Sequence, residues 1–370
     1  MRVIFDARRS VGRATGIGRV IDGLLEALAE IDGGHRYLIL TGEKDPVAGL
    51  SHEMFEVRRI GLPVNSFFIN TTLPALARSW HADVAYFPFW FAPLTMPCPF
   101  VVAIHDLIQI FHPESFSFAR RTLFRAYAPL VARRARRIHA LAGHGRDALH
   151  QVLGVGLDRI DVISPAIPPP QRNRGGSAFA VHPLAPRERP FALYVGNHKP
   201  HKNLGRLLRA FARVADRLES DLVVAGAKSS DDDPDSLPCA RLVDDLSLGS
   251  RVHFTGQIDD ATLQGLYREA RFFVLPSLYE GFGLPAIEAM ACGTPVACSN
   301  TTSLPEVVGD AALTFDPRDE SAIASVLVRL DRSPELRAEL SRKGTSRSKE
   351  FSWTRSAEAW LASLERAAGR

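Results

Sequence analysis

Residues 272–317 read FFVLPSLYEGFGLPAIEAMACGTPVACSNTTSLPEVVGDAALTFDP and decide the fold of the second half of the chain. The apolar run Phe272–Leu275 predicts a buried parallel strand, and two glycines around Phe282 follow it. A helix is expected from Leu284 to Gly293, where Gly and Pro end it, and a second strand covers Pro295–Cys298. The glycine turn therefore leaves backbone N–H groups at a helix N-terminus, where the helix dipole favours an anion such as a phosphate.

Two carboxylates flank this turn, Glu280 at its mouth and Glu288 eight residues later. A carboxylate beside a phosphate site is expected to bind hydroxyls, such as those of a sugar or a ribose. If both residues were helical, a rise of about 1.5 Å per residue would separate them by roughly 12 Å. Carboxylate pairs of glycosidases lie about 5 Å apart in retaining enzymes and at most about 9.5 Å apart in inverting ones. The spacing therefore predicts two binding carboxylates rather than an acid/base pair.

The composition is that of a soluble globular protein. With 370 residues, 46% hydrophobic and 23% charged, the chain is expected to form two or three domains. A net charge of +4 is consistent with anionic substrates or a membrane surface. The apolar run within residues 1–6 is too short for a signal peptide. Four cysteines without metal-ligand spacing fit a reduced, cytoplasmic compartment: Cys98, Cys239, Cys292 and Cys298.

One uncharged stretch of 21 residues, Val84–Ile104, is long enough to span a bilayer. It contains four prolines, which would break a spanning helix repeatedly. We therefore interpret it as a strand, an aromatic loop around Phe89 and Trp90, and a second strand.

Short apolar strands alternate with helical stretches along the first half, which predicts an α/β fold with a parallel sheet. The first strand, Arg2–Asp6, leads into a basic loop, and Gly16-Ile17-Gly18-Arg19 then opens a helix. This order suits a phosphate-binding turn, although a plain loop is an equal alternative because the full G-x-G-x-x-G pattern is missing. His105 follows the strand Phe100–Ile104 directly, at the edge where open α/β sheets bind ligands. The alternative for His105-Asp106 is a helix entry capped by Asp106.

Eight arginines and no acidic residue lie between Phe116 and Arg146, interleaved with aromatic and aliphatic residues. This pattern favours a basic amphipathic helix on anionic lipid, and a solvated helix with its apolar face in the core is the alternative. No nucleic-acid module is recognisable. The expected acceptor or membrane face consists of Phe89, Trp90, Arg120, Arg121, Phe124 and Arg125.

A stretch rich in Pro, Gly and Arg, residues 168–190, is the expected linker. A second α/β series follows it, so we expect two Rossmann-like domains, 1–167 and 191–350, facing across a cleft. The C-terminal helix, residues 351–370, is expected to pack back on the N-terminal domain. The first turn of the second domain carries Lys199 and Lys202 just before a helix, where two lysines can neutralise a diphosphate.

Two features suggest a metal site, and we expect neither to be one. His198 and His201 lie close in sequence but lack further ligands. The acidic run from Asp231 to Asp235 is better explained as a solvated turn.

These motifs together resemble the retaining glycosyltransferases of family 4, which have the two-domain GT-B fold. The resemblance covers nearly the whole chain and is strongest from Phe191 to Pro317. Its main motif is Glu280-Gly281-Phe282-Gly283-Leu284-Pro285, continuing to Glu288, the E-x7-E of the family. The stretch Leu304–Ala312, the Lys202-Asn203 turn, the Gly16–Arg19 loop and His105-Asp106 are also typical, and they occur in the family's order.

The resemblance implies a role for each matching residue. Lys202 is expected to bind the donor's diphosphate, Glu280 the sugar hydroxyls and Glu288 the ribose. Backbone N–H groups of Gly281, Phe282, Gly283 and Leu284 would face the donor. His105 would lie by the reacting carbon, and Gly16 and Gly18 would let the first loop approach the diphosphate or the acceptor. Asn197 and Lys199 are also expected to bind the donor. Many relatives have Arg where Asn197 stands, so Lys199 or Arg8 is expected to supply that charge. The turn Ala142-Gly143 also departs from the family's Ser-Glu-Phe-Ser.

The expected function is transfer of a hexose, with retention and without a metal or other cofactor, from a nucleotide sugar to a lipid-linked glycan. Resemblance to bacterial mannosyltransferases indicates GDP-mannose as the donor and surface polysaccharide or lipopolysaccharide as the product. The protein would act at the inner face of the cytoplasmic membrane. The alternatives are a UDP-sugar donor, a UDP-sugar epimerase on the same fold, and an inactive glycan-binding subunit.

Overall fold

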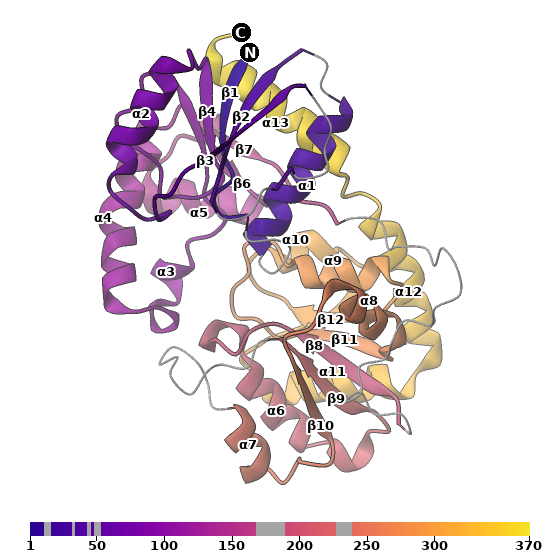
Figure 1. Ribbon diagram of the computed structural model, residues 1–370. Helices are drawn as coiled ribbons and strands as arrows, with labels where there is room; N and C mark the ends of the chain where they lie inside the picture. Colours follow the sequence, from indigo (N-terminus) through magenta and orange to yellow (C-terminus); the bar gives the residue numbers. More distant parts are fainter. Residues whose placement is uncertain (11–15, 32–33, 43–45, 48–52, 168–188, 227–238) are drawn as a thin grey trace. The chain divides into compact units, whose positions relative to one another are not determined.

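The computed structural model describes residues 1–10, 16–31, 34–42, 46–47, 53–167, 189–226 and 239–370. The chain divides into two compact units, each built on its own sheet (Figure 1). Unit 1 comprises Met1–Ile110, Phe118–Pro168 and Phe351–Arg370, and unit 2 comprises Phe111–Ser117 and Pro169–Glu350. Unit 2 thus includes a short segment, Phe111–Ser117, from the part of the sequence expected to form the N-terminal domain. Residues 168–188 of the expected linker lie outside the described residues.

The sheet of unit 1 has seven parallel strands in the order β3-β2-β1-β4-β5-β6-β7. The strands are β1 (Arg2–Asp6), β2 (Arg36–Thr41), β3 (Phe55–Arg59), β4 (Val84–Phe87), β5 (Phe100–Ala103), β6 (Arg137–Ala140) and β7 (Ile160–Val162). Its helices are α1 (Gly16–Ile31), α2 (Ile69–Ser79), α3 (Ile108–Phe111), which ends in unit 2, α4 (Phe118–Arg134), α5 (Gly143–Leu153) and α13 (Trp353–Ala368). The sequence predicts these seven strands at Arg2–Asp6, Tyr37–Leu40, Phe55–Ile60, Val84–Phe87, Phe100–Ile104, Arg137–Leu141 and Ile160–Ile163. Each observed strand begins and ends within one residue of its predicted range.

Successive residues of a strand point to opposite faces, so β1 and β2 of unit 1 each supply residues to two cores. Ile4 and Leu38 pack with α2, α4 and α5, whereas Val3 and Tyr37 pack with α1 and α13. Helix α13 therefore completes a layer of unit 1, where Trp360 is fully buried. Its Ser363 hydroxyl also accepts a hydrogen bond from His139 of β6, at 2.8 Å.

The sheet of unit 2 has six parallel strands in the order β10-β9-β8-β11-β12-β13. The strands are β8 (Phe191–Val195), β9 (Asp221–Ala225), β10 (Val252–Gly256), β11 (Phe272–Leu275), β12 (Val296–Ser299) and β13 (Ala312–Phe315). The helices are α6 (Leu204–Ala212), α7 (Cys239–Asp245), α8 (Asp260–Glu269), α9 (Leu284–Ala291), α10 (Leu304–Val308), α11 (Glu320–Arg332) and α12 (Pro334–Ser348). The sequence predicts a helix over Leu204–Leu218, whereas α6 ends six residues earlier, at Ala212. The backbone of Val214 leaves the helical region at φ −133° while its side chain enters the core.

Both sheets contain a point at which the strand order reverses. In unit 1, β1 lies between β2 and β4, and in unit 2, β8 lies between β9 and β11. Ligands of open parallel sheets bind outside the carboxyl ends of the strands at such a point. We therefore expect the predicted donor site at the turns that follow β8 and β11.

The uncharged stretch Val84–Ile104 forms β4, an aromatic loop and β5, as predicted. Within the described part of the chain, no helix is both long and apolar enough to cross a bilayer.

Candidate functional site

Lys202 and Glu280 meet at the reversal point of the unit 2 sheet. Lys202 ends the turn that follows β8, and Glu280 lies in the turn that follows β11, the neighbouring strand. The Lys202 Nζ donates to Glu280 Oε1 at 2.7 Å. Two residues that are 78 positions apart in sequence thus form one charged pair at the edge where a ligand is expected.

Glu280 is held in place by its own turn and by the start of α10. Its Oε1 also accepts from the Ser277 hydroxyl at 2.7 Å, and its backbone N–H donates to the Thr302 hydroxyl at 3.1 Å. The buried Ser303 hydroxyl donates to the carbonyl oxygens of Glu280 and Phe282, at 2.9 and 3.0 Å. These bonds fix the carboxylate without help from a ligand, which is the preorganisation that a binding site requires.

The glycine turn permits the sharp entry into α9. Gly283 has φ +103°, a conformation that side chains rarely adopt, and a Cβ there would lie 2.5 Å from Leu304 Cδ2. Helix α9 begins at the next residue, Leu284, and Gly283 provides no side-chain cap for it. Pro285 has no N–H, and the Ala286 N–H donates to the Gly283 carbonyl oxygen at 3.0 Å. The contact between the N–H groups of residues 281–284 and a donor therefore stays a prediction.

Glu288 lies on α9, beyond the glycine turn, and is half-buried. The hydroxyl of Tyr267, on α8, donates to Glu288 Oε2 at 3.0 Å. Tyr267 is itself buried, and its carbonyl oxygen accepts from the Thr294 hydroxyl. The second glutamate of the motif is thus oriented by a different helix from the one that carries it.

Asn203 joins the two turns of the site. It adopts a left-handed conformation with φ +60°, which Asn tolerates better than most residues. Its Nδ2 donates to the carbonyl oxygens of Pro276 and Pro317, at 2.9 and 2.7 Å, and its Oδ1 accepts from Arg206. The sequence marked Lys202-Asn203 as typical of the family, and the structure shows that Asn203 fastens the β8 turn to the β11 turn.

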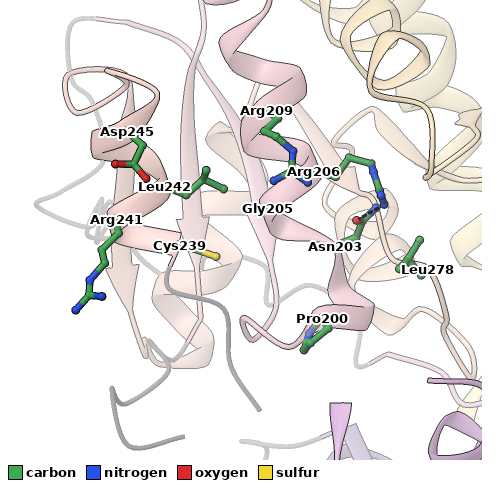
Figure 2. Close-up of a pocket in the computed structure, with 10 residues that line it drawn as sticks. All are labelled: Pro200, Asn203, Gly205, Arg206, Arg209, Cys239, Arg241, Leu242, Asp245 and Leu278. Atoms are coloured by element: carbon green, nitrogen blue, oxygen red, sulfur yellow. Dashed lines mark hydrogen bonds between the residues drawn. The ribbon is translucent and has the colours of Figure 1, made fainter. Parts of the chain in front are cut away.

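A pocket of about 490 Å³ opens beside Asn203 (Figure 2). Its lining comes from α6, α7 and the two turns: Pro200, Asn203, Gly205, Arg206, Arg209, Cys239, Arg241, Leu242, Asp245 and Leu278. Lys202, Glu280 and Glu288 do not line it, so this pocket differs from the predicted donor site.

The contacts of Lys199 and Asn197 are with other residues of unit 2. Lys199 Nζ donates to the Ser115 carbonyl at 3.5 Å and lies 5.2 Å from the centre of the Phe116 ring. Asn197 accepts a hydrogen bond from the Tyr194 hydroxyl through its carbonyl oxygen, at 3.0 Å. The prediction that Lys199 and Asn197 bind the donor stays untested by these contacts.

In unit 1, His105 is a neutral hydrogen-bonding group. Its Nε2 lies 2.7 Å from the Pro88 carbonyl oxygen, which can only accept, so Nε2 carries the proton and Nδ1 is an acceptor. Burial lowers the pKa of His105, and the nearby charge of Arg9 lowers it further. His105 therefore suits a sugar hydroxyl better than a phosphate.

The two arginines of the first loop differ. Arg8 is buried and forms a bidentate pair with Asp6, with both N–O distances at 2.7 Å. Asp6 thus pairs with the Arg8 charge, and the prediction that Lys199 or Arg8 supplies the charge that relatives have as Arg at position 197 stays untested. Arg9 stacks 3.3 Å above the Phe89 ring and donates to Asn65, and burial beside Arg120 lowers its pKa to about 10. Residues 11–15 lie outside the described part, so the approach of the loop before Gly16 and Gly18 is not described.

The predicted membrane face needs correction. Phe124, Trp90 and Phe89 are core residues of unit 1, because they pack with one another and with α4. Among the described residues of unit 1, the exposed aromatic side chains are instead Phe118, Phe68 and Phe67, with 74%, 71% and 59% exposure.

The arginines expected on one amphipathic helix are also divided. Helix α4 carries Arg120, Arg121, Arg125, Arg133 and Arg134. Arg137 lies on β6 and pairs with Asp161, and Arg146 lies on α5.

No group of three or more His, Cys, Asp or Glu residues suited to a metal occurs among the described residues. His201 bonds to Ser115 instead, and the acidic run from Asp231 to Asp235 lies outside the described residues.

Comparison with known proteins identifies the family. The model of Glycosyltransferase Family 4 matches residues 14–170, and that of Glycosyl transferases group 1 matches residues 180–347. The O-antigen chain mannosyltransferase B of Escherichia coli is 41% identical over 165 residues, covering 44% of this chain and 42% of that protein. The serotype-specific mannosyltransferase WbdA of Escherichia coli is 26% identical over 399 residues, covering 96% of this chain and 47% of WbdA. The chain thus spans less than half the length of these two relatives.

Among solved structures, sucrose-phosphate synthase from Thermosynechococcus elongatus superposes with a TM-score of 0.77 at 21% identity, covering 99% of this chain and 98% of that one. The two family models place the chain among the group 1 and family 4 glycosyltransferases, and the likeness to this structure shows the GT-B fold predicted from the sequence.

Proposed function

We propose that this protein transfers a mannosyl group from GDP-mannose to a lipid-linked saccharide during assembly of a surface polysaccharide or lipopolysaccharide. The observation that carries the proposal is the Lys202–Glu280 pair at the reversal point of the unit 2 sheet. Mannosyl transfer is supported by two relatives whose names state it. The donor's nucleotide and the acceptor are inferred from the same resemblance.

Lys202 and Glu280 divide the donor between them. The Lys202 ammonium stabilises the charge that develops on the leaving diphosphate, together with the backbone N–H groups at the start of α9. Glu280, fixed by Ser277, accepts hydrogen bonds from sugar hydroxyls. Since cationic side chains supply this stabilisation, the proposed reaction uses no metal ion.

Glu288 accepts from the ribose hydroxyls, with its orientation set by Tyr267. For retention, the acceptor hydroxyl attacks the anomeric carbon on the same face from which the diphosphate leaves. The leaving phosphate takes the hydroxyl proton, so no enzyme nucleophile is needed. From unit 1, His105 Nδ1 accepts a hydrogen bond from a hydroxyl of the donor sugar.

We further propose that unit 1 binds the inner face of the cytoplasmic membrane. The surface consists of the exposed rings of Phe67, Phe68 and Phe118 and the exposed arginines Arg120 and Arg125 of α4. Exposed aromatic rings beside arginines suit the boundary between headgroups and acyl chains of an anionic leaflet.

A donor screen tests the proposed function. Purified protein is incubated with membranes that carry lipid-linked saccharides and with GDP-mannose, UDP-glucose, UDP-galactose or UDP-N-acetylglucosamine, and nucleotide release is measured. We expect release of GDP from GDP-mannose. Release from a UDP-sugar would correct the donor, and an altered free sugar nucleotide without acceptor would indicate an epimerase. No release from any donor would contradict the enzyme and favour a binding subunit.

A further inference from the structure

A short segment from the first half of the sequence is built into unit 2. Residues Phe111–Ser117 belong to unit 2, although the chain on both sides of them belongs to unit 1. The segment takes the last residue of α3 and a 3₁₀ turn, Pro113–Ser115. We call it the strap.

One end of the strap is fastened to the turn that carries Lys202. The Ser115 side chain is fully buried, and its Oγ lies 3.0 Å from Nδ1 of His201, the residue before Lys202. The rings of Phe116 and His201 are parallel within 9°, with centroids 6.5 Å apart. The Ser115 carbonyl and the Phe116 ring also hold the Lys199 ammonium.

The other end is fastened to the turn that carries Glu280. The ring of Phe111 stacks on Tyr279, the residue before Glu280, with centroids 5.6 Å apart and an interplanar angle of 23°. His112 meets the same tyrosine ring edge-on at 5.9 Å. The two turns are also joined directly, because the Leu278 N–H donates to the His201 carbonyl at 2.7 Å.

The strap therefore contacts the immediate neighbour of each residue in the charged pair. A shift of the His201 backbone moves Lys202, and a shift of Tyr279 moves Glu280, because each pair of residues is consecutive. Displacing a site by about 1 Å is enough to lose about a hundredfold in rate.

We propose that the strap is a positioning element of the donor site, with Ser115 and Phe111 holding Lys202 and Glu280 at the spacing that a sugar diphosphate requires. The proposal rests on the proposed function of that site. Ser115 acts through His201 and Lys202, and Phe111 acts through Tyr279 and Glu280. Burial, together with the charges of Lys202, His112 and Lys199, lowers the pKa of His201 to about 3, so the ring that Ser115 contacts is neutral at working pH.

A double-mutant cycle tests this role. Isothermal titration calorimetry measures the affinity for GDP, and nucleotide release measures the reaction rate. The four proteins are the wild type, Ser115→Ala, Lys202→Ala and the double variant. Loss of one hydrogen bond is expected to weaken GDP binding about three- to tenfold in the wild-type background. In the Lys202→Ala background the same change is expected to cost less than about twofold, because Ser115 acts through Lys202.

Two further variants separate positioning from general stability. Ser333→Ala removes a serine cap of α12 and is expected to lower the melting temperature. Its effect on GDP affinity is expected to be the same in the wild-type and Lys202→Ala backgrounds. Phe111→Leu, at a half-exposed position that tolerates change, is expected to lower the release rate more than it weakens GDP binding. In a protein that already carries Glu280→Gln, Phe111→Leu is expected to lower the release rate no further.

The outcomes are distinguishable. Equal losses from Ser115→Ala in both backgrounds, or a Phe111→Leu protein with wild-type release, would overturn the positioning role while leaving the glycosyltransferase intact. A wild-type protein that binds neither GDP nor UDP would contradict the proposed function, and the strap proposal with it. If Ser115→Ala does not fold, the Phe111→Leu cycle with Glu280→Gln decides.

Discussion

Two ion pairs of the molecule have the same chemistry and different surroundings. In unit 1, Arg8 and Asp6 are two residues apart, share two hydrogen bonds and have side chains only 1% and 7% exposed. In unit 2, Lys202 and Glu280 come from different turns, share one hydrogen bond and are 17% and 10% exposed. Both pairs follow strands at a reversal point of a sheet. We call the first pair, which is local in the sequence, the closed pair. We call the second, which the fold assembles from two turns, the open pair, because its lysine is more exposed than either partner of the first.

Breaking the closed pair is expected to have the largest effect, on stability. Asp6→Asn leaves the buried Arg8 guanidinium without its counter-charge, which typically costs about 3–5 kcal/mol of unfolding free energy. Urea unfolding followed by circular dichroism measures this. The double variant Asp6→Asn/Arg8→Met should recover much of the loss, since it removes the uncompensated charge. A cost below about 1 kcal/mol for Asp6→Asn would show that the pair is not closed.

Breaking the open pair is expected to affect catalysis instead. Lys202→Ala should lower kcat/KM for the donor about a hundred- to a thousandfold, as loss of one preorganised charge donor does. Its unfolding free energy should fall by less than that of Asp6→Asn, because Lys202 is 17% exposed and Glu280 keeps its hydrogen bond from Ser277. Lys343→Ala is the matched control, since Lys343 pairs with Asp310 and Glu339 on the surface of unit 2. A Lys202→Ala enzyme with the activity of the control would remove the distinction between the two pairs.

The sequence was sufficient for the elements and for the residues of the motif. All described strands were found because buried parallel strands read as short apolar runs between turn residues. Lys202 and Glu280 were chosen by resemblance, and Ser277 could have been added, because it precedes Glu280 by three residues in the same turn. Tyr267 and Ser115 had no such signal, since their partners lie 21 and 86 residues away and on other elements.

The predictions that were wrong concern side chains whose burial the sequence does not show. Phe124 and Trp90 look like membrane residues beside so many arginines, and only packing shows that they face the core. The sequence likewise cannot show that Arg8 is neutralised while Arg9 has no ion pair with any described residue. Both facts depend on the direction in which a side chain leaves its loop.

Each unit also contains a buried neutral histidine bonded to a serine, and this extends the comparison to pH. His139 of unit 1 bonds to Ser363, and His201 of unit 2 bonds to Ser115. Burial lowers the pKa of each to about 3, whereas an unfolded histidine titrates near 6.5. The unfolded state therefore binds more protons between these values, so stability falls as pH falls below about 6.5.

The expected slope is about 1.4 kcal/mol per pH unit for each histidine. Urea unfolding between pH 7 and pH 5 measures it. His139→Gln should remove the part of the slope that belongs to unit 1. A wild-type stability that is constant or rises as pH falls over this range would contradict neutral burial.

Exposed charges are expected to have the smallest effects. Arg120→Gln or Arg125→Gln should each weaken binding to vesicles with anionic lipid by about 1 kcal/mol, or about fivefold. Arg342→Gln, at an exposed position of α12, is the control and should bind as the wild type does. Sedimentation with vesicles of phosphatidylglycerol and phosphatidylethanolamine measures the difference. If the control loses as much as the α4 variants, attraction depends on net charge and not on the unit 1 surface.

The central claim is that the open pair, Lys202 and Glu280, holds the sugar nucleotide. The most direct test compares GDP release from GDP-mannose by the wild type and by Glu280→Gln, with membranes as the source of acceptor and with GDP affinity measured separately. The account predicts release by the wild type, and a loss of about a hundredfold or more in Glu280→Gln with GDP affinity nearly unchanged, because the carboxylate binds the sugar. Equal release by the two proteins would contradict it.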